Sequence, residues 1–290
     1  MNTKGQKKIR IAVQKSGRLN EDSMRMLKEC GIDFSNGMNK LKSTALNFPL
    51  EVLFLRDDDI PEYVAQGVAD IGIVGENVLV ESKASVKVIE RLGYGKCRLS
   101  IAIPKGQKYS GVQSLSGKRI ATTYTNVLQE FLRKEKVKAE IHEISGSVEI
   151  APGIGLADAI CDIVSSGSTL FMNGLEEVET VMKSEAVLIG NENLSSLQKE
   201  VIERLLFRIR ASRKAKHNKY VLLNAPNDQL KKICKLIPGM RSPTILPLVE
   251  PGWSSVHSVI EEERFWDIIE KLRDAGAQGI LVVPIEKMVI

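Results

Sequence analysis

Short apolar runs separated by polar, glycine-containing turns recur along the first half of the chain. Residues 9–13, 51–55 and 69–75 each read as a strand that ends in a polar turn, and a segment with helical spacing follows each turn. The alternation resumes with strands at 97–104, 119–123 and 139–144 and a helix at 126–136. Strands and helices alternating at these lengths predict an α/β architecture with parallel strands.

Polar residues mark the predicted helix ends. Asn20 is expected to cap the first helix, and Gly31 to close it. Asp57 or Asp58 is expected to cap the next helix, with Pro61 in its first turn.

Two distant segments share one pattern. VADIGIVGENV (68–78) and LADAICDIVSSG (156–167) each place a small residue and an aspartate before an apolar strand, then a glycine loop before a helix. The repeat predicts two duplicated α/β lobes with a ligand in the cleft between them. A chance similarity, as parallel α/β proteins can produce, is the alternative.

The pattern changes after a long amphipathic helix, expected at 195–210. The polar stretch RASRKAKHNK (210–219) has the composition of a linker. Beyond it the order strand, helix, strand, strand, helix, strand, over 220–283, predicts a ferredoxin-like module with Trp253 and Trp266 in its core.

Composition narrows the chemistry. The 290 residues carry a net charge of +5, which permits an anionic ligand without demanding nucleic acid. The basic run at 204–219 lacks the interleaved aromatic residues that stack on bases, so no nucleic acid is expected as a partner. Three scattered histidines argue against zinc or Ser/His/Asp chemistry.

The chain is expected to work in the cytoplasm. Four cysteines without CxxC spacing indicate free thiols in a reducing compartment. No export signal and no apolar run of membrane-spanning length is seen in the sequence, so no membrane partner is expected.

The segment GLADAICDIVSSGSTL (155–170) carries the strongest chemical signal. Asp158 and Asp162 project to one face of a predicted strand, at what is expected to be its carboxyl end. The hydroxyl-rich loop that follows can cradle a phosphate with backbone N–H groups and hydroxyls: Ser165, Ser166, Gly167, Ser168 and Thr169. The combination suits a phosphorylated sugar, whose hydroxyls or Mg²⁺ the acids would hold. A serine-rich turn with Asp158 as a helix cap is the alternative.

These residues also carry a family resemblance. Glu149 followed by the 155–170 segment resembles the motif of the ATP phosphoribosyltransferases, which catalyse the first step of histidine biosynthesis. Further matching segments span the chain: QKSGRL (14–19), RDDDIP (56–61), GVADIGIVGENVL (67–79), KRIATTY (118–124), NGLEEVE (173–179), SPTILPL (242–248) and LVVPIEKM (281–288). One departure is Gly153, where family members often have arginine.

The resemblance implies a fold and a domain division. It implies two periplasmic-binding-protein-like α/β lobes that form the catalytic cleft, followed by a ferredoxin-like (ACT-like) βαββαβ domain of the long form of the family. The expected limits are 1–96 with 184–212 for lobe I, 97–183 for lobe II and 217–290 for a regulatory domain.

The resemblance also implies an activity. Adenine N1 of ATP would attack C1 of 5-phosphoribosyl 1-pyrophosphate (PRPP) and expel pyrophosphate, with Mg²⁺ as cofactor. Free histidine would inhibit the enzyme through the last domain of a homo-oligomer, a dimer or a hexamer. Such a reaction needs charge neutralisation and positioning more than a covalent nucleophile, which agrees with the shortage of histidines.

Residue roles follow as hypotheses. Asp158, Asp162, Lys15 and Arg18 are the catalytic candidates, the two acids also as Mg²⁺ ligands and the two cations as clamps on phosphate. Glu149, Gly155, Ala157 and residues 165–169 are assigned to PRPP. Arg56, Asp57, Glu76 and Asn77 are assigned to ATP, and Asn224 and Thr244 to histidine. Solvated charges at Lys15 and Arg18, helix capping by Asp57 and a surface position for Glu149 are the alternatives.

Two other classes of function remain open at this point. A solute-binding protein would close two lobes on a small anion without a reaction, and a non-catalytic regulatory subunit would carry a degraded phosphate loop. ATP-dependent release of pyrophosphate from PRPP separates the enzyme from both.

Overall fold

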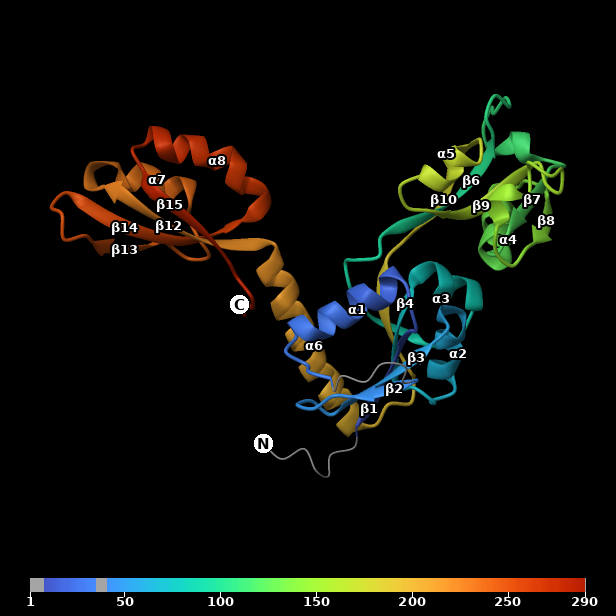
Figure 1. The fold of residues 1–290 in the computed structure, drawn as a ribbon, viewed down its shortest axis with the longest axis horizontal. Coiled ribbons are helices and arrows are strands. Elements are labelled where there is room, and N and C mark those ends of the chain that lie inside the picture. Colours follow the sequence, from blue (N-terminus) through green and yellow to red (C-terminus); the bar gives the residue numbers. More distant parts are fainter. Residues whose placement is uncertain (1–7, 35–40, 290) are drawn as a thin grey trace. The chain divides into compact units, whose positions relative to one another are not determined.

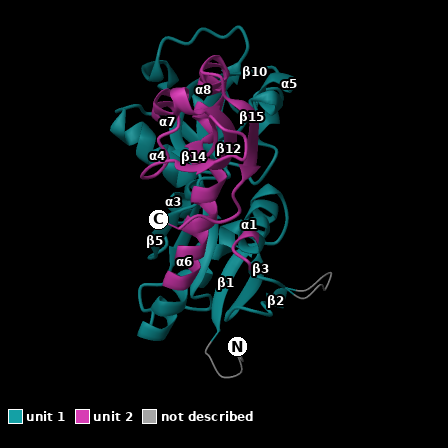
Figure 2. Cartoon of the chain, turned by 90° about the vertical axis from the view of Figure 1, so that its left-hand side faces the viewer, with its two compact units in different colours: residues 1–28, 32–202 teal, residues 29–31, 203–290 magenta. Residues whose placement is uncertain are grey.

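The computed structural model describes residues 8–34 and 41–289, and its elements are labelled in Figure 1. The chain divides into two compact units, residues 1–28 with 32–202 and residues 29–31 with 203–290 (Figure 2). The finer division into three domains that the sequence predicts remains a prediction.

The first unit contains two sheets. The first sheet has the strand order β2-β3-β1-β4-β11-β5, in which β1 runs parallel to β3 and β4 while β11 runs antiparallel to β4 and β5. Its elements are β1 (Ile9–Gln14), α1 (Arg18–Glu29), β2 (Lys42–Thr44), β3 (Leu50–Leu55), α2 (Ile60–Ala65), β4 (Ile71–Gly75), α3 (Glu76–Ser82), β5 (Lys87–Arg91) and β11 (Ala186–Gly190).

The second sheet has the order β10-β6-β9-β7-β8, in which β7 runs parallel to β8 and β9 while β6 runs antiparallel to β9 and β10. Its elements are β6 (Cys97–Pro104), β7 (Arg119–Thr122), α4 (Thr125–Lys134), β8 (Glu140–Glu143), β9 (Ala159–Val164), α5 (Ser168–Met172) and β10 (Leu175–Ser184).

The α/β class is confirmed, and the two sheets contain antiparallel strand pairs besides the parallel ones that were expected. The chain passes from the first sheet to the second between β5 and β6 and returns between β10 and β11. A strand that enters a sheet without a helical crossover is free to run antiparallel, and β6 and β11 do so.

The central strands of both sheets in the first unit are buried on both faces, which explains their continuous apolar runs. All five residues of β11 are buried, and separate clusters pack on the two faces of the second sheet. On the first sheet, α2 lies directly on β4 because Gly72 leaves room, since a Cβ there would stand 2.7 Å from Ile60 Cγ2.

The second unit is a ferredoxin-like βαββαβ module, as expected. Its sheet has the order β13-β14-β12-β15, with all pairs antiparallel, and α7 and α8 cover one face. After α6 (Ser196–Lys216), its elements are β12 (Asn218–Pro226), α7 (Leu230–Leu236), β13 (Thr244–Pro247), β14 (Trp253–Glu261), α8 (Glu262–Asp274) and β15 (Gln278–Pro284).

Two local expectations fail in the α6 and α8 region. The expected linker is helical as far as Lys216, because Ala211, Ser212 and Ala215 are buried and extend the apolar side of α6. Trp266 is 76% exposed on α8 and packs edge-on against Phe265 instead of entering the core.

The predicted N-terminal caps are also wrong, whereas Gly31, with φ +68°, follows the end of α1 as expected. Helix α1 begins at Arg18, so Asn20 lies inside it and donates through Nδ2 to the carbonyl of Gln14. Asp57 and Asp58 lie in a 3₁₀ turn before α2 and make no capping hydrogen bond. The turn supplies the helix entry that a cap would otherwise provide.

No helix in the described part of the chain is both long and apolar enough to cross a bilayer.

Candidate functional site

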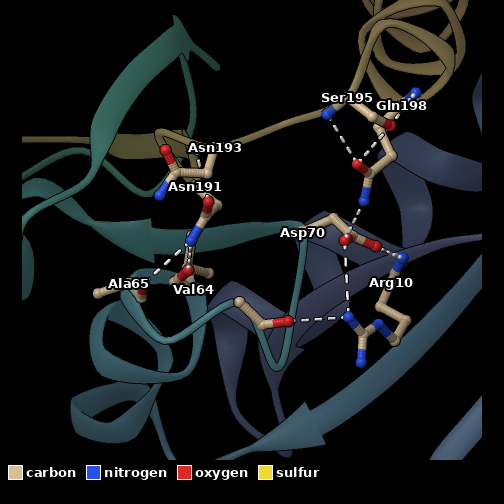
Figure 3. Close-up of polar contacts among 9 residues, drawn as sticks. Arg10, Val64, Ala65, Asp70, Asn191, Asn193, Ser195 and Gln198 are labelled. Carbon is tan, nitrogen blue, oxygen red and sulfur yellow. Dashed lines mark hydrogen bonds and ion pairs between the residues drawn. The ribbon is translucent and has the colours of Figure 1, made fainter.

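An arginine and an aspartate join the amino ends of two neighbouring parallel strands in the first sheet (Figure 3). The Arg10 N–H donates to Asp70 Oδ2 at 2.7 Å, and Arg10 Nη2 lies 3.6 Å from Asp70 Oδ1. Arg10 Nη2 also donates to the Gly67 carbonyl, and Gln198 Nε2 donates to Asp70 Oδ1 at 2.6 Å. Asp70 is buried and fully occupied by these contacts.

The second sheet repeats this arrangement. The Arg119 N–H donates to Asp158 Oδ2 at 2.9 Å, and Arg119 Nη2 donates to Asp158 Oδ1 at 3.1 Å. Arg119 Nη1 donates to the Gly155 carbonyl, as Arg10 does to that of Gly67. The repeated sequence pattern therefore corresponds to a repeated contact, in which the aspartate anchors the start of a strand.

This contact corrects the expected position of Asp158. Strand β9 begins at Ala159, so Asp158 lies at its amino end, and roughly 13 Å of extended chain separates it from Asp162. Hydrogen bonds from Arg119 hold the pKa of Asp158 below its usual value. Gly155 and the buried Ala157 lie in the same turn, away from the phosphate loop. Gly153, the departure from the family pattern, is exposed nearby.

Asp162 differs from Asp158 in its surroundings. Its Oδ1 accepts one hydrogen bond, from the N–H of Ile163 at 2.7 Å. Burial raises the pKa of Asp162, and the charge of Glu149 raises it further. Glu149 lies on a 3₁₀ turn after β8, so the structure brings these two acids near each other. Such a pair gains from a cation or from hydroxyl donors.

The loop after β9 has the form expected of an anion cradle. Gly167 has φ +82°, a left-handed conformation in which a side chain would be strained although the space is open. Ser166 and Ser168 hydroxyls lie 3.0 Å apart, and the serines of the loop and Thr169 are exposed. The Ser168 N–H also donates to Ser166 Oγ at 3.5 Å, so a ligand at this loop would replace local, exposed hydrogen bonds.

A cavity of about 500 Å³ lies at the carboxyl ends of β3, β7 and β8. Its lining includes Asp57, Asp58, Tyr124, Glu143 and Ser145. Partial desolvation raises the pKa of Asp58, and the charges of Asp57 and Asp59 add to the effect. Burial raises the pKa of Tyr124, with smaller contributions from the charges of Asp162 and Asp57. Tyr124 thus lines the cavity and also senses the charge of Asp162.

The side chain of Asn77 is engaged in contacts within the first unit. It is buried, its Nδ2 donates to the Tyr124 hydroxyl at 2.9 Å, and its Oδ1 accepts from the Ser184 hydroxyl at 2.7 Å. Glu76 is held by both terminal nitrogens of Arg91, which also contacts Glu185. These contacts orient both residues expected on the ATP side.

The three cationic candidates stay exposed. The Lys15 N–H donates to the Leu55 carbonyl at 2.7 Å, so the loops after β1 and β3 lie together and bring Lys15 near Arg56. Arg18 begins α1 on the same loop. The side chains of Lys15, Arg18 and Arg56 are solvent-accessible, as the binding of anions requires.

Sequence reasoning missed Tyr124, Glu143 and Glu81. The Glu81 carboxylate accepts from the N–H groups of Asn126 and Val127, both at 2.9 Å, and so caps α4 from α3. Glu143 is the last residue of β8, and Tyr124 lies two positions past the end of β7. The rule that ligands bind at the carboxyl ends of strands would have found both. Nothing in the sequence around Glu81 indicates its capping contact with α4.

Asn224 and Thr244 lie on the sheet face that α7 and α8 leave uncovered. Asn224 pairs with Ser255 and Thr244 with His257, so they flank β14 on either side. His257 is hydrogen-bonded to the Tyr220 hydroxyl and to Ser255. The two residues therefore belong to one polar patch.

Within residues 8–34 and 41–289, no three carboxylate, histidine or cysteine side chains form a metal-binding group. Asp158 is engaged by Arg119 and is a poor ligand. Asp162, with one backbone donor, remains able to bind a cation that also takes oxygens from a substrate.

Two α/β lobes, with a hydroxyl-rich glycine loop after β9, define a two-lobed α/β fold. The fold is similar to that of a histidine kinase sensor domain with similarity to periplasmic binding proteins, with TM-score 0.50 and 10% identity over 72% of this chain and 91% of the other.

The chain belongs to the ATP phosphoribosyltransferase family. The family model described as ATP phosphoribosyltransferase matches residues 56–211, and that described as HisG, C-terminal domain, matches residues 215–287. A relative from Cytophaga hutchinsonii named ATP phosphoribosyltransferase is 59% identical over 97% of this chain and 98% of its own. One from Bacteroides thetaiotaomicron with the same name is 58% identical over 97% of this chain and all of its own.

A solved structure supports the same relationship. The ATP phosphoribosyl transferase (HisG:HisZ) complex from Thermotoga maritima contains a chain that aligns with TM-score 0.60 and 30% identity. The alignment covers 70% of this chain and 98% of that chain.

Proposed function

We propose that this chain is an ATP phosphoribosyltransferase that joins adenine N1 of ATP to C1 of PRPP, giving N1-(5-phosphoribosyl)-ATP and pyrophosphate. This is the first step of histidine biosynthesis. The observation that carries the proposal is the Gly167 loop beside Asp162, at the carboxyl end of β9, in a chain of this family.

PRPP occupies the second sheet in this proposal. The N–H groups and hydroxyls of residues 165–169 hold the 5-phosphate, and Asp162 with Glu149 accepts hydrogen bonds from the ribose hydroxyls. Positive charge develops on the ribose as pyrophosphate leaves, and the Asp162 carboxylate stabilises it. Asp158, Gly155 and Ala157 support the loop from the other end of β9 and touch no substrate.

ATP and the leaving pyrophosphate face the loops of the first sheet. Lys15, Arg18 and Arg56 neutralise phosphate oxygens, and Asp57 lines the cavity beside them. Glu76 and Asn77 act by holding the chain between the two sheets in place.

Magnesium fits the donors present, with Asp162 as its protein ligand. When bound, Mg²⁺ would neutralise pyrophosphate oxygens and make pyrophosphate a better leaving group. The protein's own part is to keep the Asp162 carboxylate partly desolvated, so that a cation lowers its raised pKa.

The direct test is pyrophosphate release from PRPP, with and without ATP. The proposal expects release only when both substrates are present, together with formation of the phosphoribosyl nucleotide. A protein that binds PRPP tightly and releases no pyrophosphate with ATP would be a binding protein instead.

Regulation by histidine is part of the proposal. Free histidine would bind the polar patch around Asn224 and Thr244, on a sheet face suited to pairing between copies of the chain in a homo-oligomer. Binding there would have to favour one of two assembled states to reach the catalytic site. An enzyme that consumes ATP for biosynthesis is expected to act in the cytoplasm.

A further inference from the structure

We infer that Arg98 is a positioning residue for the phosphate loop, defined as residues 165–169. The inference rests on the function proposed above, because it concerns how the same loop is held in its binding conformation. Arg98 lies near the start of β6 and pairs with Val164, the last residue of β9 before the loop.

The guanidinium of Arg98 is fixed on one side by Glu177 of β10. Arg98 Nε donates to Glu177 Oε1 and Nη2 donates to Oε2, both at 2.5 Å. Two parallel bonds hold the plane of the guanidinium as well as its position. Because of this pairing, the pKa of Glu177 lies below its usual value.

The third nitrogen of the guanidinium reaches the loop. Arg98 Nη1 donates to the carbonyl oxygen of Ser165 at 3.4 Å. Strand β10, strand β6 and the loop are thus linked through one side chain, which Glu177 prevents from swinging away.

The contact matters because a peptide unit is planar. In a trans peptide the carbonyl of Ser165 and the N–H of Ser166 point in opposite directions. A carbonyl held toward Arg98 therefore keeps the Ser166 N–H pointing to the other side of the chain, where the proposed phosphate would accept a hydrogen bond from it. Without the contact this exposed peptide can rotate, and the N–H must be ordered again when phosphate binds.

Orientation, rather than charge, is the role that the geometry assigns. The positive charge of Arg98 is offset by Glu177, so little of it remains for a phosphate. A lysine would keep the charge and lose the rigid three-nitrogen arrangement.

The test compares Arg98→Lys and Glu177→Gln with the full-length enzyme. We expect the Kd and KM for PRPP to rise about tenfold in Arg98→Lys, because one charge-assisted hydrogen bond to the loop is lost. The rise should be smaller in Glu177→Gln. The KM for ATP and the melting temperature should stay close to those of the wild type.

A matched control lies on α4 of the same unit. Arg133 makes the same fork with Glu130, through Nε at 3.0 Å and Nη2 at 2.7 Å, on an exposed surface. Arg133→Lys should leave both KM values unchanged.

The outcomes separate this inference from the proposed function. Arg98→Lys with wild-type PRPP affinity would overturn the positioning role, and so would an equal rise in the KM for ATP. Gly167→Ala, measured in parallel, tests the loop itself. If Gly167→Ala weakens PRPP binding while Arg98→Lys does not, the loop assignment stands and the Arg98 inference fails; if Gly167→Ala binds PRPP normally, the loop assignment is wrong.

Discussion

At the scale of single residues, the surroundings of each acid decide what it can do. Asp158 and Asp162 lie four positions apart and are identical in the sequence pattern. Asp158 is paired with Arg119, whereas Asp162 has no cationic partner within the described part of the chain, and burial raises its pKa. Asp158 therefore stabilises the fold, and Asp162 is the acid that we propose contacts the substrate.

Replacement by asparagine should reduce kcat but not stability at Asp162, and reduce stability but not kcat at Asp158. An acid with a raised pKa costs stability once the unfolded chain ionises, so Asp162→Asn should keep or raise the melting temperature at neutral pH while kcat falls about 100-fold or more. Asp158→Asn should lower stability by about 1–2 kcal/mol, because Arg119 loses a charged acceptor, and leave kcat nearly unchanged. Calorimetry and steady-state kinetics on the two variants decide the matter, and a reversed pattern would contradict these roles.

The pH dependence of activity and of stability follows from the raised pKa of Asp162 and the lowered pKa of Asp158. Since Asp162 is needed as a carboxylate and its pKa is raised, kcat/KM for PRPP should fall on acidification at a higher pH than an ordinary aspartate would give. The pKa of Asp158 is lowered, so its contribution to stability is present above the unfolded value and is lost as the pH falls through the folded one. An acid limb that does not change in Asp162→Asn would show that another group controls it.

At the scale of elements, close contacts fix how the strand ends meet. Gly75 ends β4, and a Cβ at this position would stand 2.5 Å from Asn77 Oδ1. Asn77 in turn holds Tyr124 and Ser184. The absence of one side chain thus lets three segments of the first unit join.

Gly75→Ala should therefore release Asn77 from both partners. We expect a loss of about 1–3 kcal/mol in stability from overpacking, with lower activity because Tyr124 lines the cavity. Gly117→Ala is a useful comparison, because Gly117 has φ +72° with no atom within 4 Å of an added Cβ, so it measures backbone strain without a clash. Equal activity in the two variants would mean that the Asn77 contacts do not matter for the site.

Most strands and the turn at Gly167 were predictable from the local pattern, but several contacts were not. The strands and Gly167 could be found because apolar runs and hydroxyl-rich turns are local features. The position of Asp158 was wrong because spacing alone does not tell which end of a strand an acid occupies. Arg98 contacts Ser165, which lies 67 positions away in the sequence, and Glu81 caps α4 at Asn126, which lies 45 positions away. Local spacing carries no information about such contacts.

At the scale of the whole molecule, a second unit with its own sheet suggests a separate control site. Its uncovered face carries Asn224 and Thr244 next to Ser255 and His257. Neither residue belongs to the first unit, where the substrates are proposed to bind. Histidine inhibition and catalysis should therefore be separable by mutation.

Asn224→Ala and Thr244→Ala should raise the histidine concentration for half-inhibition by about tenfold or more, as the loss of a hydrogen bond to a charged ligand implies. Activity without histidine should not change. Lys232→Ala, at an exposed position on α7, is the control and should retain inhibition. Wild-type inhibition in both patch variants would place the effector elsewhere.

A structure of the enzyme with PRPP bound tests the account most directly. We predict the 5-phosphate within hydrogen-bonding distance of the N–H groups of Ser166, Gly167 and Ser168, with the ribose hydroxyls toward Asp162. A 5-phosphate bound instead at the Lys15–Arg18 loop, with residues 165–169 facing solvent, would contradict it.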